Sequence, residues 1–92
     1  MGTFHHGKGD LHGITVVVHG RDGRTWVGRC DTIDDAGVHL HDADLHEPAT
    51  AAQPREQWLS NAVAWGIWPR LPHALVPSAD VERVERLGAL RA

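Results

Sequence analysis

Apolar and polar residues alternate with a period of two at the start of the segment 16–43, and this period predicts β-strands. Val16 and Val18 point to one face of the expected sheet, and Val17 and His19 point to the other. Similar alternation returns twice further along the segment. It therefore predicts three consecutive antiparallel strands, the first of which begins at Val16.

Turn signals separate these strands. An Asp-Gly pair within residues 21–24 is the strongest short-range hairpin signal, because both central residues of such a turn must accept a positive φ. The second strand, residues 25–33, places Trp26 and Cys30 on the same face. Asp-Asp-Ala-Gly at 34–37 then reverses the chain again.

The third strand is predicted over residues 38–41, where Val38 and Leu40 point inward while His39 and His41 point outward. Three short, strongly twisted strands build only part of a barrel-like core. The rest of the chain must therefore supply the strands that complete it.

A helical period follows Pro54, a residue well suited to the first turn of a helix. Four apolar residues recur there at helical spacing: Trp58, Leu59, Ala62 and Trp65. Gly66 is available to end this helix, which we predict over residues 55–65. Its apolar stripe must be buried, either against the sheet or against a neighbouring subunit.

Tryptophan is frequent, with 4 in 92 residues, and three of the four lie between residues 58 and 68. In one interpretation Trp26 belongs to the core, and Trp58 and Trp65 hold the helix against it. In the other, Trp65 and Trp68 are partly exposed and either anchor an interface or stack on nucleic-acid bases. The pattern leaves both interpretations open.

Two prolines, Pro69 and Pro72, break the regularity after the helix, so a fourth strand is predicted only over residues 73–76. The segment 81–87 is ambiguous, because its apolar residues fit one face of a helix as well as a strand. We favour a one-turn connection over residues 78–80 that leads into a strand.

The first three predicted strands resemble the first motif of the Sm and Sm-like family. The positions that match its pattern are Val16, Val18, Asp22, Gly23, Arg24, Trp26, Gly28, Cys30, Ile33 and Asp34. The interval from Asp34 to Val38 resembles the shorter turn of the Hfq branch. Residues 75–84 match the second motif, an apolar strand, a tight turn and a short final strand. The resemblance covers about 40 of the 92 residues in two blocks.

This resemblance implies a mainly β fold, namely a small five-stranded, strongly bent antiparallel barrel of the Sm/SH3-like type. A short helix is inserted between its third and fourth strands. We expect one domain over residues 14–92, with the insert at about 44–72 and a flexible arm over residues 1–13.

The resemblance also implies self-assembly. In this family the exposed edges of strands four and five pair between subunits, which implies a cyclic homo-oligomer, a hexamer or a heptamer. The residues expected at that interface are Trp58, Trp65, Leu75, Val76, Val81 and Val84.

A nucleotide pocket is implied between the turn after the second strand and the turn of the second motif. Asp34 occupies the family's acidic position in the first turn. The second turn carries Pro77, Ser78 and Ala79 where the family has basic residues, and the first lacks a base-stacking aromatic residue. The residues expected to contact single-stranded RNA are Arg21, Arg24, Arg29, Asp34, Trp68 and Ser78.

Net charge changes this picture. A net charge of −3 with neutral histidine does not favour nonspecific nucleic-acid binding, which needs clustered lysine and arginine.

No apolar run approaches about 18 residues, so no membrane-spanning helix is expected. The lack of a hydrophobic signal core favours a cytoplasmic protein. Cys30, the single cysteine, is expected to be a small buried hydrophobe.

Candidate chemistry is sparse. No grouping of acid, base and nucleophile has catalytic spacing, so we expect neither enzyme activity nor a cofactor. Asp34 and Asp35 are explained as turn residues. A histidine cluster with nearby carboxylates suggests zinc, but no ligand spacing supports it and a solvated strand face explains it as well. That cluster is His39, His41 and His46.

The sequence therefore predicts an Sm-like, ring-forming module that binds RNA without catalysis. The alternative is a protein-interaction or structural assembly module that uses the same barrel and binds no nucleic acid.

Overall fold

The structure is a computed structural model that describes residues 11–90. Residues 1–10 of the predicted arm lie outside the described residues. The last residue of that predicted arm, Gly13, contacts the sheet, because its backbone N–H donates to the carbonyl oxygen of Cys30. The elements in chain order are β1 (Thr15–Gly20), β2 (Thr25–Asp34), β3 (Gly37–His46), α1 (Arg55–Trp65), β4 (Leu71–Pro77), the 3₁₀ turn η2 (Ser78–Asp80), β5 (Val81–Arg86) and the 3₁₀ turn η3 (Leu87–Leu90).

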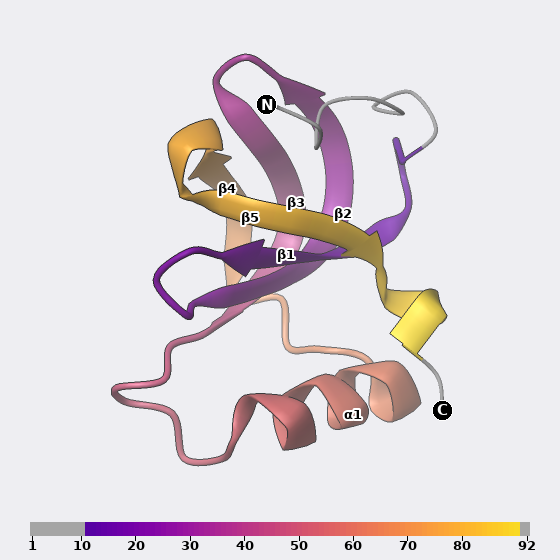
Figure 1. The fold of residues 1–92 in the computed structure, drawn as a ribbon. Coiled ribbons are helices and arrows are strands. Elements are labelled where there is room, and N and C mark those ends of the chain that lie inside the picture. Colours follow the sequence, from indigo (N-terminus) through magenta and orange to yellow (C-terminus); the bar gives the residue numbers. More distant parts are fainter. Residues whose placement is uncertain (1–10, 91–92) are drawn as a thin grey trace.

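The strands form one antiparallel sheet in the order β4-β3-β2-β1-β5, strongly bent around its inner face (Figure 1). This confirms the mainly β fold, its five strands and the helix between strands three and four. The barrel, however, is not closed. Within residues 11–90 β4 pairs only with β3 and β5 only with β1, which leaves two strand edges without a partner.

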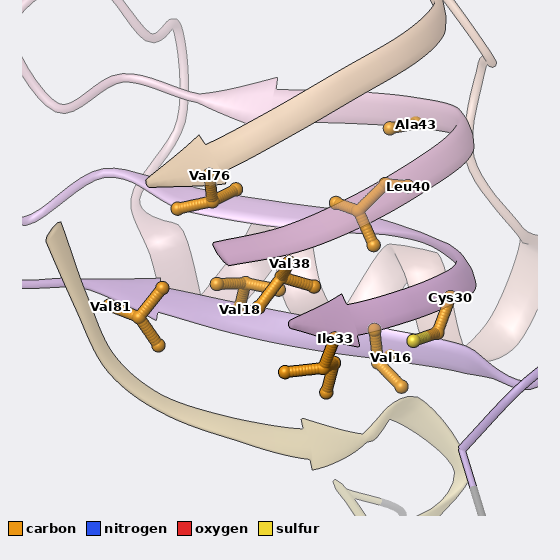
Figure 2. Close-up of a cluster of buried hydrophobic side chains, with 9 residues drawn as sticks. All are labelled: Val16, Val18, Cys30, Ile33, Val38, Leu40, Ala43, Val76 and Val81. Carbon is orange, nitrogen blue, oxygen red and sulfur yellow. The ribbon is translucent and has the colours of Figure 1, made fainter. Parts of the chain in front are cut away.

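The inner face of the sheet carries the main hydrophobic core (Figure 2). All five strands contribute to it, because alternate residues of each strand point to the same side. The core residues are Val16, Val18, Cys30, Ile33, Val38, Leu40, Ala43, Val76 and Val81. Burial, together with the neighbouring Asp31 carboxylate, raises the pKa of the Cys30 thiol. The cysteine is therefore a packing residue, as predicted.

The opposite face of β1 and β2 is buried as well. Val17 and Val27 are cross-strand partners, fully buried although they lie outside the inner cluster. Helix α1 lies on this side of the sheet (Figure 1), and its Ala62 is buried. The helix has the predicted bounds, and Gly66 ends it with a φ of 85°. Trp65 does not hold it against the sheet, because 86% of this side chain is exposed.

Strand β3 is longer than predicted and continues to His46, where a polar loop was expected after residue 41. A β-bulge explains the difference. Asp42 adopts a positive φ of 49°, and together with Ala43 it stands opposite Gly28 of β2. A Cβ atom on Gly28 would lie 2.7 Å from the Cβ of Ala43, so this close approach requires glycine. The bulge returns Ala43 to the core and lets pairing resume.

The C-terminal segment confirms the strand interpretation of residues 81–86 and the one-turn connection over residues 78–80. Strand β4 is also longer than predicted and includes Pro72, which an edge strand tolerates. Strand β5 is tied to β1 by His19, whose Nε2 lies 2.6 Å from the Glu85 carboxylate. No helix within residues 11–90 has the length and apolar character needed to cross a membrane.

Candidate functional site

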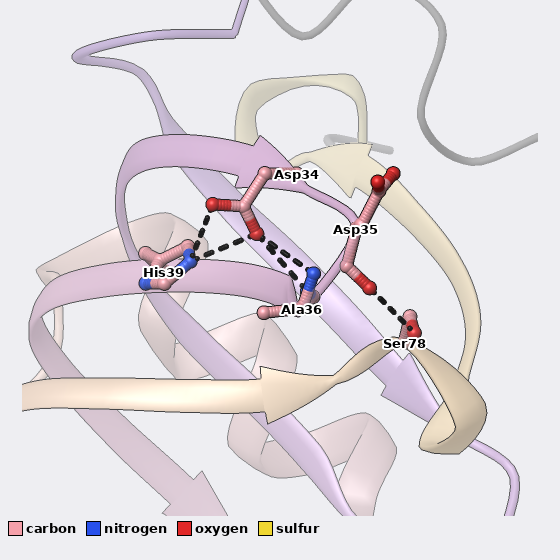
Figure 3. A network of polar contacts seen from close by, with 6 residues as sticks. Asp34, Asp35, Ala36, His39 and Ser78 are labelled. Carbon is pink, nitrogen blue, oxygen red and sulfur yellow. Dashed lines mark hydrogen bonds and ion pairs between the residues drawn. The ribbon is translucent and has the colours of Figure 1, made fainter.

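Two turns that are far apart in the sequence meet at one end of the sheet (Figure 3). The backbone N–H of Ser78 donates to the carbonyl oxygen of Ala36 over 3.0 Å, and its Oγ donates to that of Asp35 over 3.1 Å. Gly37 allows this contact, because a Cβ there would lie 2.0 Å from the carbonyl oxygen of Val76. The segments to which the resemblance assigns the nucleotide pocket are thus in direct contact.

Asp34 organises the first of these turns. Its Oδ1 accepts from the backbone N–H groups of Ala36 (3.0 Å) and Gly37 (3.3 Å), and His39 Nε2 lies 3.1 Å from both carboxylate oxygens. The hydrogen bond from His39 and those from the backbone lower the pKa of the Asp34 carboxyl below its usual value. The acidic side chain is therefore held in place by its own turn.

The His39–Asp34 contact predicts a measurable titration. Because folding lowers this pKa, the Asp34 carboxylate stabilises the folded state above its pKa in the unfolded chain. The contribution is lost as pH falls through the folded-state pKa. We expect His39→Ala to raise the pKa of Asp34, measured by carbon-detected NMR, and Asp34→Asn to reduce the loss of stability in acid. An unchanged Asp34 titration in His39→Ala would contradict this assignment.

Arg21 lies at the same end of the sheet. Its backbone N–H donates to the carbonyl oxygen of Asp80 over 2.9 Å, and its Nε donates to that of Ala79 over 3.2 Å. Three of the six residues expected to contact RNA therefore lie at this end of the sheet, in or beside the two turns that meet there: Arg21, Asp34 and Ser78. We call this group, with the intervening turn residues 35–37 and 79–80, the turn surface.

The other three residues expected to contact RNA lie away from the turn surface. Arg24 is engaged by carboxylates, at 3.0 Å from Glu47 and 3.6 Å from Asp22. Arg29 is exposed on β2, in register with His41 of β3. Trp68 follows α1 and is 80% exposed.

The residues expected at an interface fall into two groups. Val76 and Val81 are fully buried in the core, so only their backbone is available at the sheet edges. Leu75 is 48% exposed on β4, and Val84 of β5 is half-buried. Trp58 packs against His46, with ring centroids 5.4 Å apart, whereas Trp65 is exposed.

A cavity of about 900 Å³ opens between the end of β3, helix α1 and the segment that leads into β4. Three tryptophans line it: Trp58, Trp65 and Trp68. We call it the tryptophan cavity. Its polar lining includes Asp44, a buried carboxylate that receives the Arg70 guanidinium at 2.6 Å.

His46 forms part of the same wall. Its Nε2 donates to the carbonyl oxygen of Gln53 over 2.8 Å, so in the neutral ring Nδ1 is an acceptor. This Nδ1 is buried and has no hydrogen-bond partner among the described residues, and the same holds for Oγ1 of its cross-strand partner Thr25. Buried polar atoms without a partner are uncommon and call for an explanation.

The histidines considered for zinc have separate partners. His39 contacts Asp34, His46 contacts Gln53, and His41 lies 3.3 Å from Asp31. The His41 ring also meets that of His73 edge-on, at 5.0 Å between centroids. Within residues 11–90 no three or more His, Cys, Asp or Glu side chains are placed to hold a metal ion.

No protein-family model and no curated protein matches the sequence. Solved structures do match. The SmAP (LSm) protein of Methanococcus vannielii aligns at 21% identity over 83% of both chains, with a TM-score of 0.55. The Sm protein of Pyrococcus abyssii, solved in complex with a uridine heptamer, aligns at 15% identity over 85% of this chain and 89% of its own, with a TM-score of 0.59. The protein has an Sm-like fold.

A third match extends the likeness to a larger protein. A novel Sm-like archaeal protein from Pyrobaculum aerophilum aligns at 13% identity over 85% of this chain and 46% of its own, with a TM-score of 0.56. At 13–21% identity, all three likenesses concern the fold alone.

Sequence reasoning found the turn surface of this Sm-like fold but missed the tryptophan cavity. Its polar residues, Asp44, His46 and Arg70, looked like parts of a solvated loop and a linker. A signal was present nonetheless, because three tryptophans stood within eleven residues, numbers 58 to 68. Such clustering on a helix and the segment that follows it marks a surface with aromatic character.

Proposed function

We propose that this protein is a non-catalytic module that assembles with copies of itself into a closed ring and binds single-stranded RNA. The observation that carries the proposal is the open sheet. Its two edge strands, β4 and β5, each have a single neighbour within residues 11–90. Unpaired edges expose backbone donors and acceptors that readily pair with another chain.

Assembly follows from the difference between the two edges. Pairing β4 of one copy with β5 of the next is a head-to-tail contact, which closes into a ring when the rotation between copies allows it. The exposed Leu75 on β4 and the half-buried Val84 on β5 would gain burial there. By the family resemblance, the ring would hold six or seven copies.

RNA binding is supported by the turn surface and by a fold neighbour. Backbone groups, the Asp34 carboxylate and the Arg21 guanidinium converge where the two turns meet. Single-stranded RNA is recognised by such groups on its base edges and phosphates. In addition, the similar Pyrococcus abyssii protein was solved with a uridine heptamer. We assign no catalytic step to this surface.

Two measurements test the proposal. The mass in solution, measured by light scattering or native mass spectrometry, is expected to correspond to a closed ring. Fluorescent oligo-U and oligo-A are then titrated at two salt concentrations, and we expect micromolar or tighter binding that weakens with salt. Arg21→Ala should weaken it, whereas Arg55→Ala, which removes an equal charge from exposed α1, should not.

The outcomes separate the two parts of the proposal. A single chain in solution would overturn the ring. A ring that binds neither oligonucleotide would overturn RNA binding and support the second candidate function, a protein-interaction or structural assembly module. The net charge of −3 and the engagement of Arg24 by Asp22 and Glu47 favour that candidate.

A further inference from the structure

The tryptophan cavity has the size and lining of a small-ligand site. Ligand cavities commonly span about 300–1,000 Å³ and combine apolar or aromatic walls with a few fixed polar groups. This cavity measures about 900 Å³ and has indole rings beside the Asp44–Arg70 ion pair and His46. It lies between α1 and the ends of β3 and β4, away from the contact between Ser78 and Ala36.

Its aromatic side chains are unusually open. Trp65 and Trp68 are 86% and 80% exposed, and with Leu75 they are the large apolar side chains that the described residues leave exposed. A flat indole face in water is a surface on which a planar aromatic ring can stack. The turn surface offers no such ring, since its turns consist of Asp34, Asp35, Ala36 and Gly37 on one side and Ser78, Ala79 and Asp80 on the other.

The charges around the cavity are already compensated. Arg70 pairs with Asp44, and Arg24 pairs with Glu47, which also lines the cavity. A ligand held mainly by its phosphate would need an uncompensated cationic group, and a free cation would need an uncompensated carboxylate. A flat, uncharged ring with hydrogen-bonding edges needs neither. Neutral side chains that donate and accept hydrogen bonds line the cavity as well, among them the amides of Gln53 and Asn61.

We propose that the tryptophan cavity binds a nucleobase, which stacks on the indoles of Trp65 and Trp68. The base belongs either to a bound RNA strand or to a free nucleotide. The RNA source rests on the proposed function, whereas the cavity itself is tested independently with mononucleotides.

The experiment uses the full chain and follows intrinsic tryptophan fluorescence during titration with UMP, AMP and, as a ligand without a base, ribose 5-phosphate. We expect quenching and saturable binding with at least one mononucleotide and none with ribose 5-phosphate. The double variant Trp65→Ala/Trp68→Ala is expected to weaken mononucleotide binding, followed by calorimetry, by about tenfold or more. Both side chains are exposed, so folding should be retained. Glu56→Ala, on the exposed side of the same helix, is the matched control.

The same variants are then titrated with oligo-U and oligo-A, and their mass is measured. Weaker oligonucleotide binding at unchanged mass places a base of the strand in the cavity, whereas mononucleotide binding alone identifies the free nucleotide as the occupant. If the double variant binds oligonucleotides as tightly as the unsubstituted protein and no mononucleotide binds, this inference is overturned and the proposed function stays intact. A change of mass in the double variant would also overturn it, because the tryptophans would then contact another copy of the chain.

Discussion

Gly37→Ala is expected to lower the free energy of unfolding by about 3 kcal/mol or more, measured by urea denaturation. Gly37 has a φ of 144°, and a Cβ atom there would lie 2.0 Å from the carbonyl oxygen of Val76 and 2.9 Å from the backbone nitrogen of Ser78. Both obstacles are backbone atoms and cannot rotate away. The new methyl group must therefore push β4 and η2 from the β2–β3 turn.

Gly66→Ala is the matched control. Gly66 also has a positive φ, 85°, but no atom lies within 4 Å of its virtual Cβ. Only the conformational strain of an alanine with a φ of 85° and a ψ of −173° applies, about 1–3 kcal/mol. Equal losses in the two variants would mean that the turns do not approach each other as described. Gly37→Ala should also weaken RNA binding, because it separates Ser78 from Asp35 and Ala36.

Leu75→Lys is expected to convert the proposed ring into single chains while leaving the fold intact. Leu75 is 48% exposed on the β4 edge, so the isolated chain accommodates a lysine there. At a contact between copies, losing a buried leucine costs about 2 kcal/mol, which weakens each contact about 30-fold before the charge is considered. Lysine on an edge strand is also a common means of preventing edge pairing.

The measurement is the mass in solution over a range of protein concentrations, with circular dichroism to confirm the sheet. Leu75→Met keeps an apolar side chain of similar volume and should preserve the ring. A ring that survives Leu75→Lys would show that copies associate through another surface, and the tryptophan cavity would be the next candidate.

Local patterns in the sequence were sufficient for most of the fold. The Asp-Gly turn fixed the first hairpin, and the residues after Pro54 gave helix α1 its observed bounds. The choice of a strand over residues 81–86 came from the family resemblance, because the apolar spacing alone also fitted a helix.

What the sequence did not reveal depends on contacts between distant residues. The bulge at Asp42 forms where β3 passes close to Gly28 of the neighbouring strand β2. Local sequence does not show this contact, and the polar residues after His41 therefore looked like a loop. Asp44 is buried because Arg70, far along the chain, supplies its partner. The turn surface was predictable since the family motif names both of its turns. The cavity was not, because the elements around it are brought together only by the folded sheet.

The position of β1 has a consequence for how the protein is made. Strand β1 pairs with β2 on one side and with β5 on the other. Val18 can therefore pair with Val84 only after β5 has been synthesised. On the ribosome, a nascent chain that has not yet released residues 81–86 keeps one side of this valine-rich strand open to other molecules. We expect the nascent chain to depend on chaperones at that stage more than at any later one. We also expect β5 to dock slowly, because its partner β1 is far away in the sequence.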